Sequence, residues 1–490
     1  MNKVSGWKKI FALIMIISIL AGILAGCKKE DKVKLDPKNP VTISIWHYYN
    51  GAVMNAFDQL VKEFNESVGV KEGIIVESFG MGNVSELETA VLSSAKKEVG
   101  SKEIPNIFAS YADTAYEAEQ LNILADLDKY FSKEEQAEYI VSYIEEGKIG
   151  TNGELRIFPI AKSTEIFMLN ETDWKPFADA NGFTHDDLTT NEGVAKVAKK
   201  YYEWTDAATP NVANDGKAFW GRDSIPNMFI IGAKQFGVEI FEVTNGKVKI
   251  NAEKDTIRKI WDSYYVPYMS GYFMAAGKYR SDDTKVGDII SYVGSTSSSM
   301  YFPNEVTLDG KSHAVEAVVL PTPVFEGQKN VLVQQGAGMA VTKSTPEEEY
   351  ASTVFLKWFT DTDVNIRFSA HSGYMPVKKE ANSYEKFMSV VDANGIKTDK
   401  IASEALAVAF ENVQKNEMYT SKAFEGGAAA RTILENHLKD KADADRATVV
   451  QSIKSGKSHA EAVAQFDTNE NFEAWFTDIT AQLNAAVAKS

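Results

Sequence analysis

The sequence predicts an α/β protein whose chain passes between two lobes. Between residues 41 and 121, short runs that alternate apolar and polar residues are separated by amphipathic stretches at helical spacing. This alternation is typical of a parallel sheet covered by helices. At residues 158–170, Pro159 and a short polar stretch precede an apolar run at 166–169. Because proline has no amide donor for a sheet, we expect the chain to leave one lobe here and enter the other. An ordinary loop between two strands is the alternative.

The first 26 residues have the pattern of a lipoprotein signal peptide. Three lysines precede the apolar run at 10–24, which is too short for a stable membrane span. The tetrapeptide Leu24-Ala25-Gly26-Cys27 then matches a bacterial lipobox, in which small residues fit the peptidase and the cysteine sulfur takes the lipid. Cys27 is the only cysteine among 490 residues, which favours the lipid role and leaves no internal disulfide. A plain secretory signal with an incidental cysteine is the alternative.

The remaining chain is expected to be exported and anchored, not embedded. The polar segment 28–40 contains five lysines and predicts a flexible tether, and no later apolar run is long enough to cross a bilayer. We therefore expect a body held by lipid on the outer face of the bacterial cytoplasmic membrane, or on its periplasmic side in a two-membrane cell. The net charge of −16 argues against nucleic-acid binding, but it does not exclude a small anionic ligand.

Three strands are expected in the first lobe, and each is followed by a helix. The strands are residues 41–46, 74–76 and 107–109. The second helix is expected to begin at the capping box Ser85-Glu86-Leu87-Glu88. Because ligands of parallel sheets bind beyond the carboxyl ends of the strands, we expect three turns to share one rim. These turns are residues 46–51, 80–83 and 110–114.

The rest of the chain predicts further strands and a helical end. The strands are expected at residues 288–293, 315–320, 331–333 and 338–341. Pro321 and Pro323 suggest a second crossing between lobes, and the turn at 373–376 suggests a third. Thr345 followed by Pro346 predicts a helix start, and residues 470–487 form the closing helix.

Candidate ligand contacts combine aromatic rings with hydroxyl and charged groups near the predicted cleft, whose floor we place at residues 162–165. The aromatic candidates, whose flat faces and polar tips suit stacking on a sugar, are Trp46, Tyr48, Tyr49, Trp220 and Tyr374. For each of them taken alone, a place in the core or on the surface is the alternative. Residues 294–299 follow a strand, where amides and hydroxyls at a helix start bind anions or sugar hydroxyls. A serine-rich cap without a ligand is the alternative. Arg222, Asp223 and Arg431 are charged candidates, for which solvated surface is the alternative. Two further candidates, Glu165 and Asp113, are carboxylates near the predicted cleft.

Signatures of metal, nucleophile and phosphate sites are poor. The six histidines include no His-Glu-x-x-His, and neither Gly-x-Ser-x-Gly nor Gly-x-x-x-x-Gly-Lys is found. Residues 467–471 begin like a calcium loop, but Phe472 stands where that loop needs glycine. We therefore expect no cofactor and no metal.

At this point the chain resembles an extracellular solute-binding protein of ABC importers, in the family that carries sugars and related solutes. The landmarks, whose order and spacing together are specific, are the lipobox and residues 45–51, 105–107, 159–165, 336–338 and 372–377. The resemblance covers nearly all of the mature chain. It implies the periplasmic-binding-protein fold, with two lobes, each a helix-covered and mostly parallel sheet. The implied crossings lie near residues 160–165, 320–324 and 375–379.

The implied domains are an N-lobe of residues 41–161 plus 324–375 and a C-lobe of residues 162–323 plus 376–490. The resemblance also implies a monomer without enzymatic activity. Such a protein captures a small solute between the lobes and delivers it to the transmembrane subunits of an ABC permease.

Within this family the chain is similar to glycerol-phosphate binders at several pocket positions. Gly51, Ser163 and Thr164 match such positions, and Arg431 matches their phosphate-gripping arginine. The chain departs from them because Val84 and Ala112 replace a tyrosine and a glutamate, and because Glu165 replaces a proline, as in some maltose-type binders. We therefore expect a mono- or oligosaccharide first and a glycerol phosphodiester or phosphate second. The expected contacts are Trp46, Tyr48, Tyr49, Asp113, Ser163, Glu165, Trp220, Ser297, Gly336, Tyr374 and Arg431.

Two other functions remain open at this level. An exported glycoside or phosphodiester hydrolase would use Glu165 and Asp113 as its paired carboxylates. A receptor subunit that feeds a sensor kinase would have the same binding body as a transport protein.

Overall fold

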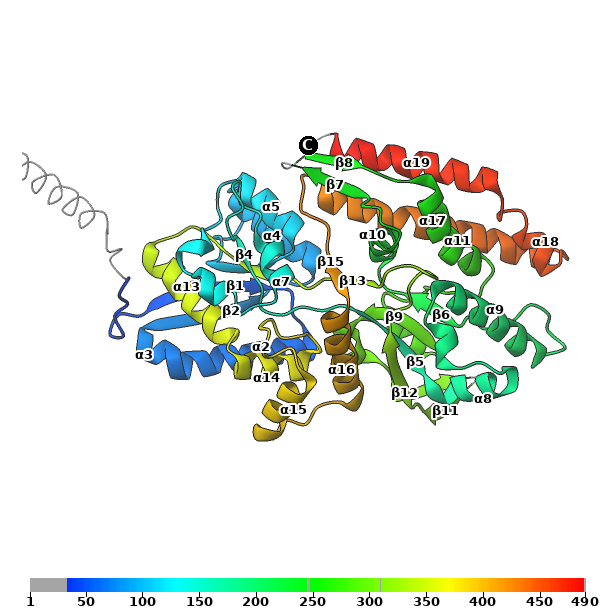
Figure 1. The fold of residues 1–490 in the computed structure, drawn as a ribbon, viewed down its shortest axis with the longest axis horizontal. Helices are drawn as coiled ribbons and strands as arrows, with labels where there is room; N and C mark the ends of the chain where they lie inside the picture. The colour runs from blue at the N-terminus through cyan, green and yellow to red at the C-terminus, as the bar shows by residue number, and fades with distance from the viewer. Residues whose placement is uncertain (1–32, 245–246, 309, 489–490) are drawn as a thin grey trace, which may run out of the picture.

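The computed structural model describes residues 33–244, 247–308 and 310–488. Figure 1 shows two halves side by side along the long axis, and each half contains its own sheet. The signal peptide and Cys27 lie outside the described residues, so the lipid anchor stays a prediction. No helix in the described part of the chain is long and apolar enough to cross a membrane.

The N-lobe contains a five-stranded sheet with the order β2-β1-β3-β14-β4. Its strands are β1 (Val41–His47), β2 (Ile74–Gly80), β3 (Ile107–Ser110), β4 (Ile157–Phe158) and β14 (Gly338–Val341). The helices of this lobe are α2 (Gly51–Phe64), α3 (Val70–Glu72), α4 (Val84–Ala95), α5 (Ala112–Gln120), α6 (Lys133–Gln136), α7 (Val141–Gly147), α13 (Pro346–Phe359) and α14 (Thr362–Ser372). Phe57 of α2 and Phe355 of α13 are fully buried in its core.

The C-lobe contains a four-stranded sheet with the order β12-β5-β9-β6. Its strands are β5 (Glu165–Asn170), β6 (Trp220–Arg222), β9 (Ser291–Ser295) and β12 (Ala317–Pro321). Two hairpins are formed by β7 (Phe241–Thr244) with β8 (Lys247–Ile250) and by β10 (Glu305–Leu308) with β11 (Lys311–Ala314). The helices are α8 (Glu171–Asn181), α9 (Asn191–Ala207), α10 (Ile225–Gln235), α11 (Lys254–Met269), α12 (Arg280–Lys285), α17 (Gly427–Lys454), α18 (His459–Val463) and α19 (Asn469–Val487).

Both sheets are mixed, so the prediction of mostly parallel sheets is wrong. β1 is parallel to β2 and β3, and β6 is parallel to β9. However, β14 is antiparallel to β3 and β4, and β5 is antiparallel to β9 and β12. The reversal follows from the crossings, because β5 and β14 each begin where the chain has just arrived from the other lobe. Both strands therefore run away from the lobe boundary, whereas their neighbours run towards it.

Three crossing segments, residues 159–164, 334–337 and 373–376, connect the lobes and pair with one another. Ser163 forms an antiparallel bridge with Gln335, and Lys162 forms one with Met375. The second crossing lies later than the predicted 320–324, because Val324 still pairs with Thr190 of the C-lobe. The chain reaches the N-lobe sheet only after β13 (Val331–Val333), which packs beside α10.

A helix pair straddles the two lobes. It consists of α15 (Tyr384–Ala393) and α16 (Lys400–Lys415), and it is followed by β15 (Glu417–Tyr419), which pairs with β13. α15 packs on α14 of the N-lobe, whereas α16 packs on β12 and on the 3-10 helix η4 (Thr296–Tyr301) of the C-lobe. Phe387 and Phe410 lie in a small core of their own between these elements. Figure 1 shows α16 between the two sheets and α15 below α14.

Local signals in the sequence located several helix starts. α13 begins at Pro346 after the Thr345 cap, as predicted. α4 begins two residues earlier than predicted, because its capping box is formed by Asn83 and Glu86 instead of Ser85 and Glu88. The Asn83 side chain accepts from the Glu86 amide at 2.9 Å, and the Glu86 carboxylate accepts from the Asn83 amide at 2.8 Å.

Trp220 is a core residue of the C-lobe, so we expect its replacement to lower the stability of the fold. Its side chain is 3% exposed, and its ring centroid lies 4.5 Å from that of Phe273. We expect Trp220→Ala to lower the free energy of unfolding by about 3–5 kcal/mol, because it leaves a cavity in a packed core. Urea unfolding measures this loss. Trp204→Ala, which removes a 36% exposed tryptophan, is the control and should cost much less; equal stabilities for the two variants would contradict the core assignment.

Candidate functional site

Polar and aromatic residues of both lobes follow strands that end at the lobe boundary. In the N-lobe, the three turns predicted to share a rim follow the parallel strands β1, β2 and β3. In the C-lobe, β6 and β9 are also parallel, so Asp223 and Ser295 lie at one edge of that sheet. The crossing segments join the two edges, which places both sets of turns around one boundary.

Four tyrosines form a cluster on the N-lobe side, hereafter the tyrosine cluster: Tyr48, Tyr49, Tyr111 and Tyr374. The Tyr48 and Tyr111 rings stack at 6.3 Å, and the centroids of Tyr49 and Tyr374 are 6.4 Å apart. The Tyr48 and Tyr374 side chains adjoin, and besides burial each influences the pKa of the other phenol. Burial raises the pKa of all four phenols, so they stay protonated at neutral pH. The cluster therefore offers aromatic surface together with neutral hydroxyls that donate and accept.

The serine run of the C-lobe meets this cluster through the third crossing. Tyr374 lies next to Ser297 of η4, whose side chain partly offsets the rise that burial causes in the pKa of this phenol. Gly373, at a φ of +68°, approaches so closely that a Cβ there would lie 3.0 Å from the Ser297 Cα. The absence of a side chain at position 373 thus allows the third crossing to rest on η4.

A carboxylate of the N-lobe lies against the start of a C-lobe helix. Asp113 is in the first turn of α5, and its carboxylate occupies the space where a Cβ of Gly427, the first residue of α17, would stand. Burial raises the pKa of Asp113 to about 6, although the charge of Arg431 lowers it. Arg431 lies one turn further along α17 and donates to the Asn227 side-chain oxygen at 2.9 Å. Asp113 and Arg431 therefore come together across the lobe boundary.

A buried polar network lies beneath the crossings. Glu165 is 3% exposed and forms an ion pair with Arg222. The Asn227 side-chain nitrogen donates to Glu165 and to Gln335, each at 3.0 Å. Because both Glu165 oxygens are engaged, this carboxylate anchors the floor of the boundary and is not free for acid–base work.

Lys162 is the second buried charge at the crossings. It is 2% exposed, and its ammonium donates to the Glu146 carboxylate at 2.7 Å and to the Gly336 carbonyl at 2.8 Å. Gly336 has a φ of +101°, and a Cβ there would lie 2.9 Å from the Ala161 carbonyl oxygen. The first two crossings therefore need glycine at this position in order to approach each other.

The predicted contacts fall into three groups in the structure. Those at the boundary are Tyr48, Tyr49, Asp113, Ser297, Tyr374 and Arg431, and those on the floor are Ser163, Glu165 and Gly336. The other two are buried in cores, because Trp46 packs in the N-lobe and Trp220 in the C-lobe. Tyr49 is also a buried member of the N-lobe core, with the same 5% exposure as Trp46. Whether any of them contacts a ligand remains a prediction.

Sequence reasoning missed Tyr111, Asn227, Gln335 and Lys162 as individual contacts. Tyr111 belonged to the rim turn at 110–114, so its position after a strand was the available signal. Asn227 had no such signal, because only the folded chain brings α10 next to Glu165 and Arg431. Within the described ranges, no group of three His, Cys, Asp or Glu side chains is placed to hold a metal ion.

The sequence and the fold match known proteins. The sequence pattern of the family described as bacterial extracellular solute-binding protein matches residues 59–395. No curated protein sequence matches the chain. The cyclic alpha-maltosyl-1,6-maltose binding protein from Arthrobacter globiformis is 16% identical with a TM-score of 0.65, over 92% of this chain and 100% of that chain.

Two further solved structures share the fold. UgpB from Mycobacterium tuberculosis, solved with glycerophosphocholine, is 16% identical with a TM-score of 0.66, over 92% of this chain and 99% of that chain. The maltotriose binding protein of Thermus thermophilus is 15% identical with a TM-score of 0.58, over 91% of this chain and 100% of that chain. These matches confirm the predicted two-lobe α/β fold.

The Asp113 carboxyl provides a pH test of the contact with α17. Because its pKa is raised to about 6 from 3.8, the folded chain binds more protons than the unfolded chain between about pH 4 and 6. The contribution of Asp113 to the free energy of unfolding therefore falls as the pH rises through this window. Above the window this contribution is fully lost. We expect Asp113→Asn to remove this fall, as measured by urea unfolding across the window.

Asp440→Asn is the matched control, because it changes an exposed carboxylate on α17. It should keep the wild-type dependence of stability on pH. If Asp113→Asn also kept it, the carboxylate would not be buried against α17.

Proposed function

Because this chain belongs to the family of bacterial extracellular solute-binding proteins, we propose that it captures a small solute between its lobes and delivers it to an ABC permease. Capture requires no covalent chemistry. A ligand that touches Tyr374 on one side and Arg431 or Ser297 on the other binds both lobes at once. Such a ligand favours the closed arrangement over any open one, because only the closed arrangement presents both surfaces together.

The proposed ligand is a neutral mono- or oligosaccharide. The observation that carries this choice is the tyrosine cluster, which faces Ser297 and the Asp113–Arg431 contact. Sugar rings stack on aromatic faces, and their hydroxyls exchange hydrogen bonds with phenols, serines and carboxylates. An anionic ligand in the same place would meet the Asp113 carboxylate. Two of the structural relatives are described as binding maltotriose or a cyclic maltosyl-maltose, which supports a saccharide here.

A glycerol phosphodiester is the second candidate. It is favoured by Arg431, which stands in the first turns of α17, where the positive end of the helix dipole also attracts an anion. UgpB, which has the same fold, was solved with glycerophosphocholine. The two candidates differ in what they require of Arg431, because a phosphate needs its charge and a neutral sugar does not.

The hydrolase hypothesis fits this geometry less well. It requires Glu165 as a free acid or base, but Arg222 and Asn227 hold that carboxylate within the buried network. The family that the chain belongs to consists of binding proteins.

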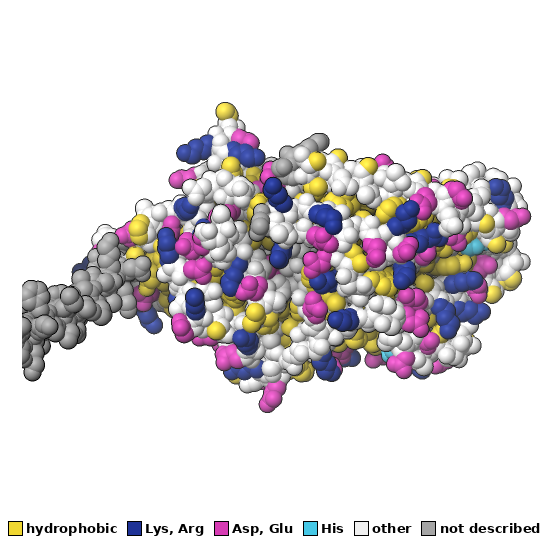
Figure 2. All heavy atoms as spheres, turned by 45° about the horizontal axis from the view of Figure 1, so that its top comes forward, with side chains coloured by type: hydrophobic (Ala, Val, Ile, Leu, Met, Phe, Trp, Pro, Cys, Tyr) yellow, Lys and Arg dark blue, Asp and Glu magenta, His cyan; other side chains and the backbone are white. Residues whose placement is uncertain are grey.

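We further propose that the protein acts as a monomer anchored through lipid on Cys27. On the face drawn in Figure 2, acidic and basic side chains are interspersed without a continuous basic band.

Thermal unfolding against a solute panel tests the proposed function. The panel contains mono- and oligosaccharides, sugar alcohols, glycerol phosphodiesters and amino acids. A solute at 100 times its dissociation constant should add about 2.7 kcal/mol of stability. We expect saccharides to raise the unfolding temperature without being converted into a product. A shift with glycerol phosphodiesters alone would replace the saccharide proposal by the second candidate, and release of product from the solute would contradict a pure binding role.

Tyr374 is the residue whose replacement best tests the ligand site. We expect Tyr374→Ala to weaken binding of the saccharide found in the panel by about tenfold or more, because it removes a stacking surface and a hydroxyl. Tyr374→Phe keeps the ring and should lose less. Isothermal titration measures both. The control is Tyr384→Ala, which removes a 42% exposed tyrosine on α15 and should leave the affinity unchanged. Equal affinities for Tyr374→Ala and wild type would remove the tyrosine cluster from the site.

A further inference from the structure

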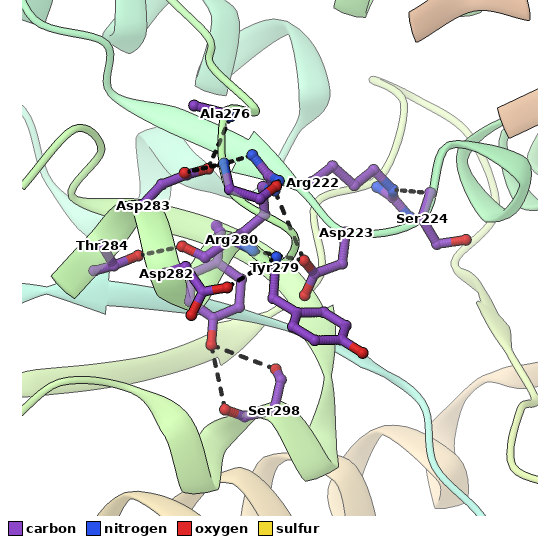
Figure 3. Close-up of polar contacts among 12 residues, drawn as sticks. Arg222, Asp223, Ser224, Ala276, Tyr279, Arg280, Asp282, Asp283, Thr284 and Ser298 are labelled. Carbon is purple, nitrogen blue, oxygen red and sulfur yellow. Dashed lines mark hydrogen bonds and ion pairs between the residues drawn. The ribbon is translucent and has the colours of Figure 1, made fainter. Parts of the chain in front are cut away.

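A second group of polar and aromatic side chains lies beside the tyrosine cluster, on the C-lobe edge (Figure 3). Asp223 directly follows β6, and Ser298 lies on η4, which follows β9. Because β6 and β9 are parallel neighbours, their carboxyl ends bring Asp223 and Ser298 to the same edge of the sheet. The figure shows that Tyr279 projects from the adjoining loop past the Asp223 carboxylate.

Two oxygens converge where Gly294 lacks a side chain. A Cβ on Gly294 would lie 2.5 Å from one carboxylate oxygen of Asp223, Oδ2, and 2.8 Å from the Ser298 hydroxyl. Any residue larger than glycine at this position would displace both groups. Glycine here therefore leaves a carboxylate and a hydroxyl oxygen side by side above the end of β9. The Ser298 hydroxyl donates to the Ser295 carbonyl at 2.6 Å, so towards a ligand it acts as an acceptor, as Asp223 does.

The Asp223 carboxylate is held in place while one oxygen stays available. Its Oδ1 accepts from the Arg280 amide at 2.8 Å. The Arg280 side chain forms a buried ion pair with Asp283, and Asp283 accepts from the Gly277 amide at 2.6 Å, so the loop is fixed by its own network. Among the described residues, none donates a hydrogen bond to Oδ2, and the Asp223 side chain is 20% exposed. The network thus positions Asp223 Oδ2 as an acceptor that receives no hydrogen bond from the described residues.

Aromatic surface adjoins this acceptor. Tyr279 is 54% exposed and precedes Arg280, so the same loop network sets its position. Tyr301, the last residue of η4, is 45% exposed. Since Ser297 contacts Tyr374 and Ser298 lies beside Asp223, adjacent residues of η4 link the tyrosine cluster to this second group.

We propose that Asp223, Ser298 and Tyr279 form a second sugar subsite, and that the ligand is therefore an oligosaccharide that extends over η4. This inference rests on the proposed saccharide-binding function. One sugar unit occupies the tyrosine cluster, and a further unit places its hydroxyls on Asp223 and Ser298 and its ring against Tyr279. Hydrogen bonds to a carboxylate are among the stronger ones available to a neutral ligand. A monosaccharide fills only the first subsite and leaves Asp223 without its ligand partner.

The test compares glucose with maltotriose by isothermal titration of the purified full chain. Wild type is expected to bind maltotriose at least about tenfold more tightly than glucose. Asp223→Asn and Tyr279→Ala should each weaken maltotriose binding by about tenfold and leave glucose binding within about twofold. Asp223→Asn keeps an oxygen for the Arg280 amide, and Tyr279 is exposed, so both variants should fold; circular dichroism melts check this. Asp440→Asn and Tyr384→Ala are the matched controls, and neither should alter binding of either sugar.

The outcomes separate the two levels of the proposal. If maltotriose binds and both variants bind it as wild type does, the second subsite is wrong, whereas the saccharide-binding function stands. If the variants weaken glucose and maltotriose equally, Asp223 and Tyr279 belong to the first subsite, and the inference of an extended ligand is overturned. If neither sugar binds to wild type, the proposed function fails, and the subsite fails with it.

Discussion

The relative placement of the two lobes depends on one buried ammonium group. Lys162 stands where the three crossings meet, and its charge is satisfied by Glu146 of the N-lobe and by the Gly336 carbonyl of the second crossing. Its backbone pairs with Met375 of the third crossing. A buried charge without a partner costs several kcal/mol, so any arrangement of the crossings has to keep these partners within reach. The crossings are therefore coupled to one another and do not act as three independent linkers.

This constraint also explains where the ligand chemistry gathers. Strands that begin at the crossings, β5 and β14, run away from the boundary, and the strands beside them end there. Strand ends leave backbone and side chains unpaired, so tyrosines, serines and carboxylates collect at the boundary instead of in the sheets. The floor network of Glu165, Arg222 and Asn227 supports them from below without offering a free group. The proposed ligand-binding groups thus lie at the lobe boundary, whereas the groups that support them are buried beneath it.

Local structure could be predicted from the sequence much better than long-range pairing. The strands predicted at 41–46, 74–76 and 107–109 are found at 41–47, 74–80 and 107–110, and α13 begins after Thr345 as predicted, because periodicity and caps act over a few residues. The antiparallel course of β14 depends on a partner more than 200 residues away, and no local pattern carries it. Trp46 and Trp220 illustrate the same limit at the site, because a tryptophan next to a strand end suits a core as well as a ligand. Asn227 became visible only when the fold placed it beside Glu165, whereas Tyr111 lay in the predicted rim turn at 110–114 without being singled out.

The straddling pair of helices has a mechanical consequence for any opening of the molecule. α15 is fastened to one half and α16 to the other, yet the two are joined by a short connection and share a small core. A linkage attached at both ends restrains separation of the halves, because separation has to displace α15 on α14 or α16 on β12 and η4. The α15–α16 pair is therefore a tie between the halves in addition to the three crossings, and the Phe387–Phe410 contact holds its two helices together.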